Sequence, residues 1–379
     1  MHDGLDFELD EDLIAVRDLS EEIFRDLATV ERIRQVETVE GGHDGRLWSV
    51  LAQAGVLGIA LPETVGGAGL GMTGLVTVLE QQGRRVAPIR LAEVLAGAAL
   101  PLANFGSSEQ IERWLTPLVN GDIIVTGAWD VDATGEVVPV HAAASDGDLL
   151  LTGRIATVPA LAVAAAVLVP VALPDGDLVV AVVPTDRDGV QVTPEAVTDR
   201  GSSATLALDG VRIAQGDLLG GGPAADWTLQ RLRVAQAAVV VGVCAEAVAV
   251  TATYTSQREQ FGRPLSTNQG VSLRAADAHL DAEAIRLSTL RAAWLLDLSR
   301  DAEVATAALV ASWWAKQGGL RVVHTTQHLH GGIGADVDYP VHRYFLWGRQ
   351  AAFALGSASQ ILAELGDLLP SAPRIGAPA

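Results

Sequence analysis

Residues 258–265 read Arg-Glu-Gln-Phe-Gly-Arg-Pro-Leu, and residues 328–334 read His-Leu-His-Gly-Gly-Ile-Gly. The first stretch ends one long segment with helical spacing and precedes the next, so Gly262 and Pro264 predict a helix–helix corner. The second stretch places glycines after a helical segment, where they permit left-handed backbone and close approach of a ligand. Taken singly, both stretches are explained by an ordinary turn and an ordinary helix C-cap.

The segments that flank these two stretches predict the rest of the architecture. Apolar residues with helical spacing fill residues 1–118 in short segments, and after residue 223 they form four long ones: Trp227 to Gln257, Thr267 to Ser299, Ala302 to Leu329 and Pro340 to Leu368. Residues 119–222 instead carry short β-rich runs between Asp-Gly and Gly-Asp turns. The sequence predicts an α+β, mostly α protein with a helical N-terminal domain (1–118), a middle β domain (119–222) and a C-terminal helical bundle (223–379).

The composition argues against several classes of protein. The formal net charge of −20 argues against binding to nucleic acid or to an anionic membrane surface, because both require a basic patch. The single cysteine, Cys244, cannot form an internal disulfide and favours a reducing, cytoplasmic compartment. The longest apolar stretch, around Ala160 to Leu173, is broken by Pro170, so no membrane-spanning segment is expected.

Neither the glycine-rich loop at residues 62–71 nor the histidines of the 328–334 stretch match a common phosphate or metal site. The loop at residues 62–71 lacks the Lys-Ser/Thr pair that a P-loop needs. No cluster of carboxylates or thiolates accompanies His328 and His330, so no metal site is expected. The arginine, glutamine and aromatic ring of the 258–265 corner, by contrast, suit a pyrophosphate and an adenine.

The motifs become specific when they are taken together and in order. They are Leu61-Pro-Glu-Thr-Val-Gly-Gly-Ala-Gly-Leu-Gly71, Phe105-Gly-Ser-Ser-Glu-Gln110 with Trp114-Leu115, the 258–265 stretch with Gln269, and His330-Gly-Gly-Ile-Gly334 with Tyr339-Pro340 and Arg343. In this combination the chain resembles the acyl-CoA dehydrogenase family from end to end. The resemblance implies a central β-barrel-like domain, a C-terminal four-helix bundle, and FAD as a cofactor that two subunits share.

The sequence departs from this family where the catalytic base is expected. Family members abstract the α-proton of the acyl thioester with a glutamate, while flavin N5 takes the β-hydride. Burial of the glutamate beside the flavin can raise its pKa toward neutrality. The resemblance places that glutamate either sixteen residues after Tyr339, at Leu355, or immediately before Arg233, at Leu232. Neither residue is an acid, so no catalytic residue is expected in this chain.

The residues expected to contact flavin divide into two groups. The stretches at residues 128–132 (Ala-Trp-Asp-Val-Asp) and 155–158 (Ile-Ala-Thr-Val) stand where the family holds its own flavin ring, and they lack most of its polar groups. The residues that reach the flavin of a neighbouring subunit in the family are kept or nearly so: Arg258, Gln260, Phe261, Gln269, Gly331 and Gly332, with His328 in place of the usual glutamine.

This division resembles the non-catalytic chain of heterotetrameric dehydrogenases that act on steroid side-chain CoA thioesters. It implies an α2β2 assembly with a catalytic acyl-CoA dehydrogenase subunit that supplies the glutamate, an acyl-CoA substrate, and electron-transfer flavoprotein as the acceptor. Two alternatives stay open. One is a self-sufficient homotetramer with an atypical base, for which Glu246 is the nearest acid on the same segment as Leu232. The other is a non-redox acyl-CoA-binding protein.

Overall fold

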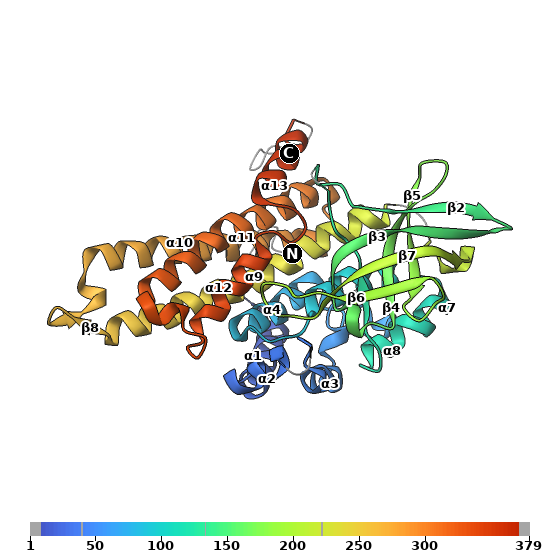
Figure 1. Cartoon of the computed structure of the whole chain (residues 1–379). Coiled ribbons are helices and arrows are strands. Elements are labelled where there is room, and N and C mark those ends of the chain that lie inside the picture. The colour runs from blue at the N-terminus through green and yellow to red at the C-terminus, as the bar shows by residue number, and fades with distance from the viewer. Residues whose placement is uncertain (1–8, 39–40, 133, 221–222, 371–379) are drawn as a thin grey trace. The chain divides into compact units, whose positions relative to one another are not determined.

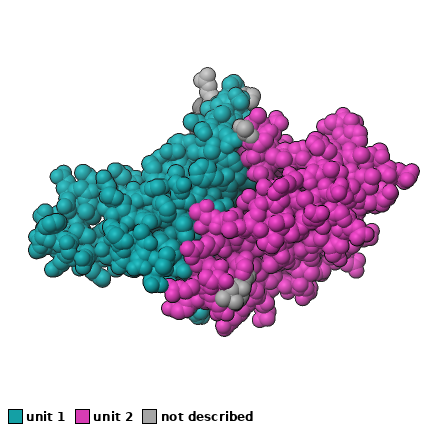
Figure 2. Space-filling view, viewed as in Figure 1, with its two compact units in different colours: residues 1–30, 76–87, 236–379 teal, residues 31–75, 88–235 magenta. Residues whose placement is uncertain are grey.

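The structure is a computed structural model that describes residues 9–38, 41–132, 134–220 and 223–370. The chain forms two compact units, each assembled from separate parts of the sequence (Figure 2). Unit 1 comprises Met1–Val30, Val76–Ala87 and Gln236–Ala379, and unit 2 comprises Glu31–Leu75 and Pro88–Ala235. The division into three consecutive domains stays a prediction, whereas the mostly helical fold with a central curled sheet is confirmed.

Unit 1 is mostly helical (Figure 1) and contains α1 (Glu11–Leu27), most of α4 (Gly71–Arg85) and α9 (Ala224–Gln257), α10 (Gln269–Asp297), α11 (Asp301–His330), α12 (Val341–Ala351) and α13 (Ala358–Leu368). The first three long helices predicted after residue 223 are confirmed. The fourth, Pro340 to Leu368, is wrong as a single helix, because Leu355 (φ 53°) and Gly356 (φ 87°) adopt left-handed backbone between α12 and α13.

Two glycines allow α4 and α9 to pack with their backbones in close contact. A Cβ atom on Gly83 of α4 would lie 2.0 Å from the carbonyl oxygen of Val239, and one on Gly242 of α9 would lie 1.9 Å from that of Glu80. Real side chains never approach backbone this closely, so any larger residue would force the helices apart. Each glycine is thus required by the packing of unit 1.

The helical part of unit 2 is built from short elements: α2 (Val30–Thr38), α3 (Gly45–Gln53), α5 (Leu91–Val94), α6 (Leu100–Phe105), α7 (Ser108–Gln110) and α8 (Thr116–Val119), with π-helical turns at Leu95–Ala99 and Ile111–Leu115. Ser107 caps α7, because its side chain accepts from the Gln110 N–H while the Gln110 side chain accepts from the Ser107 N–H. Asp44 caps α3 without a reciprocal side chain, by accepting from the N–H groups of Arg46 and Leu47.

The sheet of unit 2 contains seven strands: β1 (Val125–Gly127), β2 (Val140–Ser145), β3 (Asp148–Pro159), β4 (Ala166–Ala172), β5 (Leu178–Pro184), β6 (Val190–Pro194) and β7 (Ser203–Ile213). They are ordered β1-β4-β2-β3-β7-β6, and β5 pairs with β4. The predicted Asp146-Gly147 turn joins β2 to β3, with φ of 50° and 87°. A buried ion pair between Arg90 and Asp199, with N–O distances of 2.7 and 2.8 Å, fixes the helical part to the loop before β7.

Among the described residues, one helix, α9, is long and apolar enough to cross a membrane by length and composition. Its apolar window is 61% buried inside the protein, which is typical of a core helix. The only cysteine, Cys244, lies on this helix and is fully buried, and burial raises the pKa of its thiol. It therefore serves packing rather than nucleophilic chemistry.

Candidate functional site

The predicted corner at residues 258–265 is a β-hairpin at the tip of unit 1, where α9 ends and α10 begins (Figure 1). Strands β8 (Glu259–Gln260) and β9 (Arg263–Pro264) pair through Gln260 and Arg263, and the Leu265 N–H donates to the Arg258 carbonyl at 2.9 Å. Both turn residues have positive φ, 54° at Phe261 and 77° at Gly262, which is the geometry of a two-residue hairpin.

The side chains on this hairpin are exposed. Phe261 is 96% exposed and adopts left-handed backbone, a combination that costs free energy in an isolated chain. Arg258 is exposed, and no carboxylate pairs with it in the described residues. Gln269 is likewise exposed at the start of α10, whose first turn is capped by Asn268 through the Gly270 N–H at 3.0 Å.

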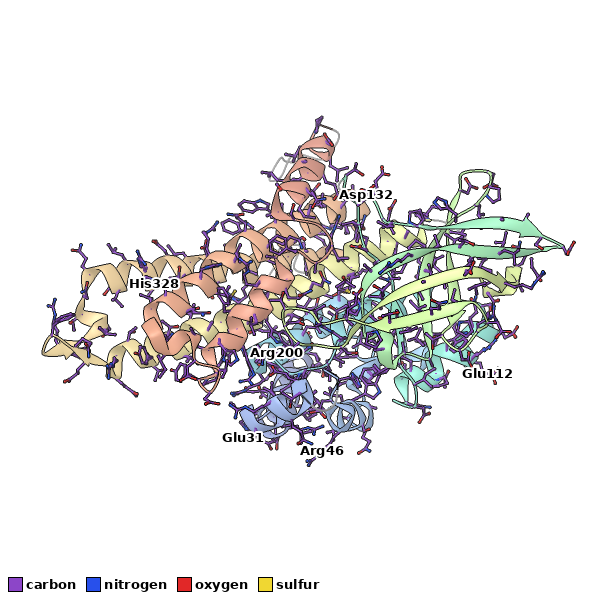
Figure 3. The ribbon with its side chains drawn as sticks, in the orientation of Figure 1. Glu31, Arg46, Glu112, Asp132, Arg200 and His328 are labelled. Atoms are coloured by element: carbon purple, nitrogen blue, oxygen red, sulfur yellow. The ribbon has the colours of Figure 1, made fainter. Side chains whose placement is uncertain are left out.

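The glycine turn at residues 331–335 follows α11 in the same unit. Gly331 has φ 64° and ψ −143°, a conformation that is open mainly to glycine. Both Gly331 and Gly332 are exposed, and a Cβ atom added at either residue would have no other atom within 4 Å. His328 lies on the last turn of α11 with an exposed side chain (Figure 3). The predicted cofactor-binding residues thus all lie on exposed positions of unit 1.

Tyr254 and His330, which are not among the predicted cofactor-binding residues, connect α11 to α9 next to this turn. The Tyr254 ring stacks on the His330 ring at 4.5 Å, and the Tyr254 hydroxyl donates to the His330 carbonyl at 3.3 Å. Nδ1 of His330 donates to the Thr326 carbonyl at 2.8 Å, and burial lowers the pKa of His330. Because Tyr254 lies one helical turn before Arg258, this stack holds the glycine turn against the end of α9. The stack depends on side-chain packing between helices distant in sequence, which no local residue pattern indicates.

Leu355, the first position where a base is expected, is buried between α12 and α13. The turn that holds it is well supported: Lys316, the only lysine in the sequence, is buried and donates to the Ala351 and Ala354 carbonyls. Ser357 caps α13 with a capping box on Gln360. The turn is therefore ordered and has an aliphatic side chain where an acid would stand.

Leu232, the second such position, is buried on α9 within unit 2. Glu246, the alternative base, belongs to unit 1 and makes an ion pair with Arg84 at 3.7 Å, while Arg84 also pairs with Glu80 at 3.0 Å. These three residues line a cavity of about 320 Å³ together with Arg17, Glu21, Gln81 and Arg85. Such a polar network is a poor place for an acyl chain.

The stretches that stand where the family holds its own flavin ring are engaged with other parts of unit 2. In the first, Ala128 and Trp129 are buried, and partial burial raises the pKa of Asp130. Asp132 (labelled in Figure 3) accepts from the backbone and hydroxyl of Thr134 in its own loop. In the second, the Thr157 N–H donates to Glu195 at 3.0 Å. These side chains do not offer a flavin ring a set of donors, so this half of the site does not fit the cofactor.

No group of three or more histidine, cysteine, aspartate or glutamate side chains that could hold a metal ion occurs in the described part of the chain. The two histidines of the 328–334 stretch have different environments, since His328 is exposed and His330 is 3% exposed.

Comparisons with known proteins agree with this geometry. Residues 11–122 match the family described as "Acyl-CoA dehydrogenase, N-terminal domain", and residues 220–365 match "Acyl-CoA dehydrogenase, C-terminal domain". Acyl-CoA dehydrogenase FadE27 of Mycobacterium tuberculosis is 38% identical over 357 residues, which cover 92% of this chain and 94% of that protein.

Two solved structures are similar in both sequence and fold. The "Tcur3481-Tcur3483 steroid ACAD G363A variant" is 44% identical with a TM-score of 0.89, covering 95% of this chain and 98% of that one. The ChsE4–ChsE5 complex from Mycobacterium tuberculosis is 36% identical with a TM-score of 0.92, covering 98% and 100%. With the helical bundle, the central sheet and these matches, the chain belongs to the acyl-CoA dehydrogenase family, whose members are flavoprotein oxidoreductases that use FAD.

Proposed function

We propose that this chain is the non-catalytic subunit of a heteromeric, FAD-dependent acyl-CoA dehydrogenase. It completes a flavin site in a catalytic partner subunit, and the partner supplies the glutamate that removes the α-proton. The observation that carries the proposal is a contrast in exposure: Phe261 at the hairpin tip is 96% exposed, whereas Leu355 and Leu232, where a base is expected, are 8% and 2% exposed.

The hairpin and the glycine turn suit the diphosphate and the adenine of FAD. The guanidinium of Arg258 carries a permanent charge and forked donors that match phosphate oxygens. The amides of Gln260 and Gln269 can donate and accept, and the Phe261 ring offers an apolar face for an aromatic base. Gly331 and Gly332 leave room for close approach of a ligand to the backbone. FAD, when bound, accepts the hydride from the β-carbon of the substrate.

A second feature of unit 1 supports an assembly. Leu273, Leu280 and Leu287 of α10 are 58%, 66% and 37% exposed and recur every seven residues on one side of the helix. The buried residues Ala278, Ile285 and Ala292 lie on the opposite side of α10. Exposed leucines that recur along one side of a helix are typical of an interface with another chain.

The partner, substrate and compartment follow from the same proposal. The assembly is an α2β2 complex with a catalytic acyl-CoA dehydrogenase subunit, and electron-transfer flavoprotein accepts its electrons. A steroid side-chain CoA thioester is the proposed substrate, a choice supported by the word "steroid" in the name of one similar structure and by the two-component complex named in the other. The proposed compartment is the cytoplasm, where the Cys244 thiol stays reduced.

The homotetramer with Glu246 as base is less well supported. Glu246 makes an ion pair with Arg84 at 3.7 Å in a cavity lined mostly by charged side chains, which is a poor environment for the acyl chain of a substrate. The non-redox acyl-CoA-binding protein has no use for an exposed Phe261 on a shaped hairpin. Neither alternative explains why the cross-subunit residues keep the family pattern while the two base positions lose it.

The ratio of flavin to protein tests the proposal. The chain is purified alone and together with a co-expressed acyl-CoA dehydrogenase chain that carries the glutamate. We expect negligible flavin in the first sample and one flavin per two chains in the second. Full occupancy of the chain alone as a homo-oligomer would falsify the proposal, and acyl-CoA binding without flavin in both samples would favour the non-redox alternative.

A further inference from the structure

The cavity that contains Glu246 lies between three helices of unit 1. It is bordered by α1, α4 and α9 and has a volume of about 320 Å³. Arg17 and Glu21 face it from α1 at a spacing of four residues, and Gln81 and Arg85 face it from α4 at the same spacing. In all, three arginines, three glutamates and one glutamine border a space that is large enough for a small molecule.

Part of this charged wall is already paired. The Arg84 guanidinium lies between Glu80, at 3.0 Å, and Glu246, at 3.7 Å. Arg17 pairs with Asp18, its neighbour in sequence, at 2.7 Å. These groups balance one another, so they form the frame of the cavity and leave little charge for a ligand.

Three side chains of the wall are left without a partner among the described residues. Gln81 is 4% exposed, yet its amide makes no side-chain hydrogen bond there. Arg85 is half-buried and Glu21 is exposed, and neither takes part in an ion pair among the same residues. A buried amide is normally hydrogen-bonded, because burial without a partner costs free energy. The amide of Gln81, with two opposite charges on the same cavity, therefore indicates a ligand.

The unpaired groups limit the charge of that ligand. A single free guanidinium, that of Arg85, suits one carboxylate, whose two oxygens match its forked donors. A phosphate dianion is less suitable, because its second negative charge would be repelled by the carboxylates of Glu80 and Glu246. The free carboxylate of Glu21 suits an ammonium group. The cavity thus offers one site for each sign of charge.

We propose that this cavity binds a small zwitterion of the amino-acid class. Its carboxylate accepts hydrogen bonds from Arg85 and from the amide of Gln81, and its ammonium group donates to Glu21. A ligand without net charge is also compatible with a chain of net charge −20, which repels polyanions. The site uses neither flavin nor acyl-CoA, so it does not depend on the proposed function.

The distance between the two charges of the ligand provides the test. The probes are glycine, β-alanine, γ-aminobutyrate and ε-aminohexanoate, added to the full-length chain in whatever assembly it purifies, and ligand-observed NMR gives each dissociation constant. Because Arg85 and Glu21 lie on two packed helices, we expect the affinity to be highest at one chain length. That compound should raise the melting temperature by about 2 °C at ten times its dissociation constant.

Compounds with a single charge and matched variants identify the groups that bind. The carboxylate and the amine of the same carbon number as the best probe should each bind at least about tenfold more weakly. Arg85→Gln and Glu21→Gln should cause losses of the same size, and Gln81→Leu a loss of about fivefold. Arg349→Gln, at another half-buried arginine of unit 1, and Glu22→Gln, beside Glu21, lie outside the cavity and should leave the affinity unchanged.

Several results would overturn the proposal. Failure of all four probes to bind would leave the cavity without this ligand class. Equal binding of the zwitterion and of its matched carboxylate would show that Glu21 takes no part. Equal losses in Arg85→Gln and Arg349→Gln would place the binding elsewhere. If Arg85→Gln does not fold, Glu21→Gln against Glu22→Gln makes the same comparison at exposed positions. Flavin content is not a readout of these experiments, so the proposed function is tested separately.

Discussion

The hairpin at residues 258–265 and the segment around Trp129 are the two regions that bear most directly on function. They differ in exposure, because the hairpin side chains lie in solvent and the Trp129 side chain is buried. The hairpin holds an aromatic ring in water on left-handed backbone, an arrangement that adds nothing to folding. The Trp129 segment is fully packed, and its indole Nε1–H donates to the Gly97 carbonyl at 2.7 Å. Features that reduce stability are kept where a ligand or partner uses them, whereas a region without a ligand can become ordinary core.

The largest effect is expected on folding stability. Trp129→Ala should lower the free energy of unfolding by about 3–5 kcal/mol, because it leaves a cavity and an unpaired Gly97 carbonyl. Phe261→Ala should change it by less than about 0.5 kcal/mol, since an exposed ring makes few contacts. Urea unfolding of both variants checks the contrast, and similar losses would contradict it.

The next effect concerns the flavin affinity of the assembly. Arg258→Ala should weaken flavin binding by about 10- to 100-fold, which is the loss of one charge-assisted hydrogen bond. Arg263→Ala is the matched control on the other strand of the hairpin and should bind flavin normally. Titration of the apo-assembly with FAD measures both, and equal losses would mean that the hairpin acts only through its net charge.

A third prediction asks whether an acid alone restores the missing function. Leu355→Glu should destabilise the chain by about 1–3 kcal/mol, because it buries a carboxyl group in a packed turn. It should give no acyl-CoA turnover by the chain alone, since the segment around Trp129 does not fit a flavin. Leu362→Glu, at a residue 53% exposed on α13, controls for the added charge. Turnover by Leu355→Glu in the isolated chain would show that its own site is open.

The smallest effect is a pH dependence from His330. Burial lowers the folded-state pKa of this histidine below its ordinary value of 6.5, so the unfolded chain binds the proton more readily. Its contribution to stability is complete above pH 6.5 and is lost as the pH falls toward the folded-state pKa. His330→Gln should flatten the change in melting temperature between pH 7 and pH 5, while His279→Gln, at an exposed residue of α10, should not.

The sequence predicted the elements whose signals are local. Helical spacing located the long helices α9 to α11, and the Asp146-Gly147 pair located a turn. Strand β2 was missed because His141-Ala-Ala-Ala-Ser145 has no apolar alternation, and it is set by pairing with β3 and β4. The break at Leu355 was missed because leucine rarely adopts positive φ, so only tertiary contacts, such as the Lys316 cap, maintain it.

The candidate site was predictable only in part, for a related reason. Arg258, Gln260 and Phe261 are adjacent in sequence, so their motif could be read directly, although left-handed backbone at a phenylalanine could not. The stack of Tyr254 on His330 and the packing of Trp129 on Gly97 join residues far apart in sequence. Such contacts depend on the packing of whole elements, which residue patterns do not encode one position at a time.

The central claim is that this chain donates to a flavin site without holding one, and flavin content measures this most directly. The absorbance ratio at 450 and 280 nm, calibrated for each protein, gives flavin per chain for the chain alone and for the assembly with a glutamate-bearing partner. The account predicts a colourless isolated chain and one flavin per two chains in the assembly. One flavin per chain, in either sample, would contradict it.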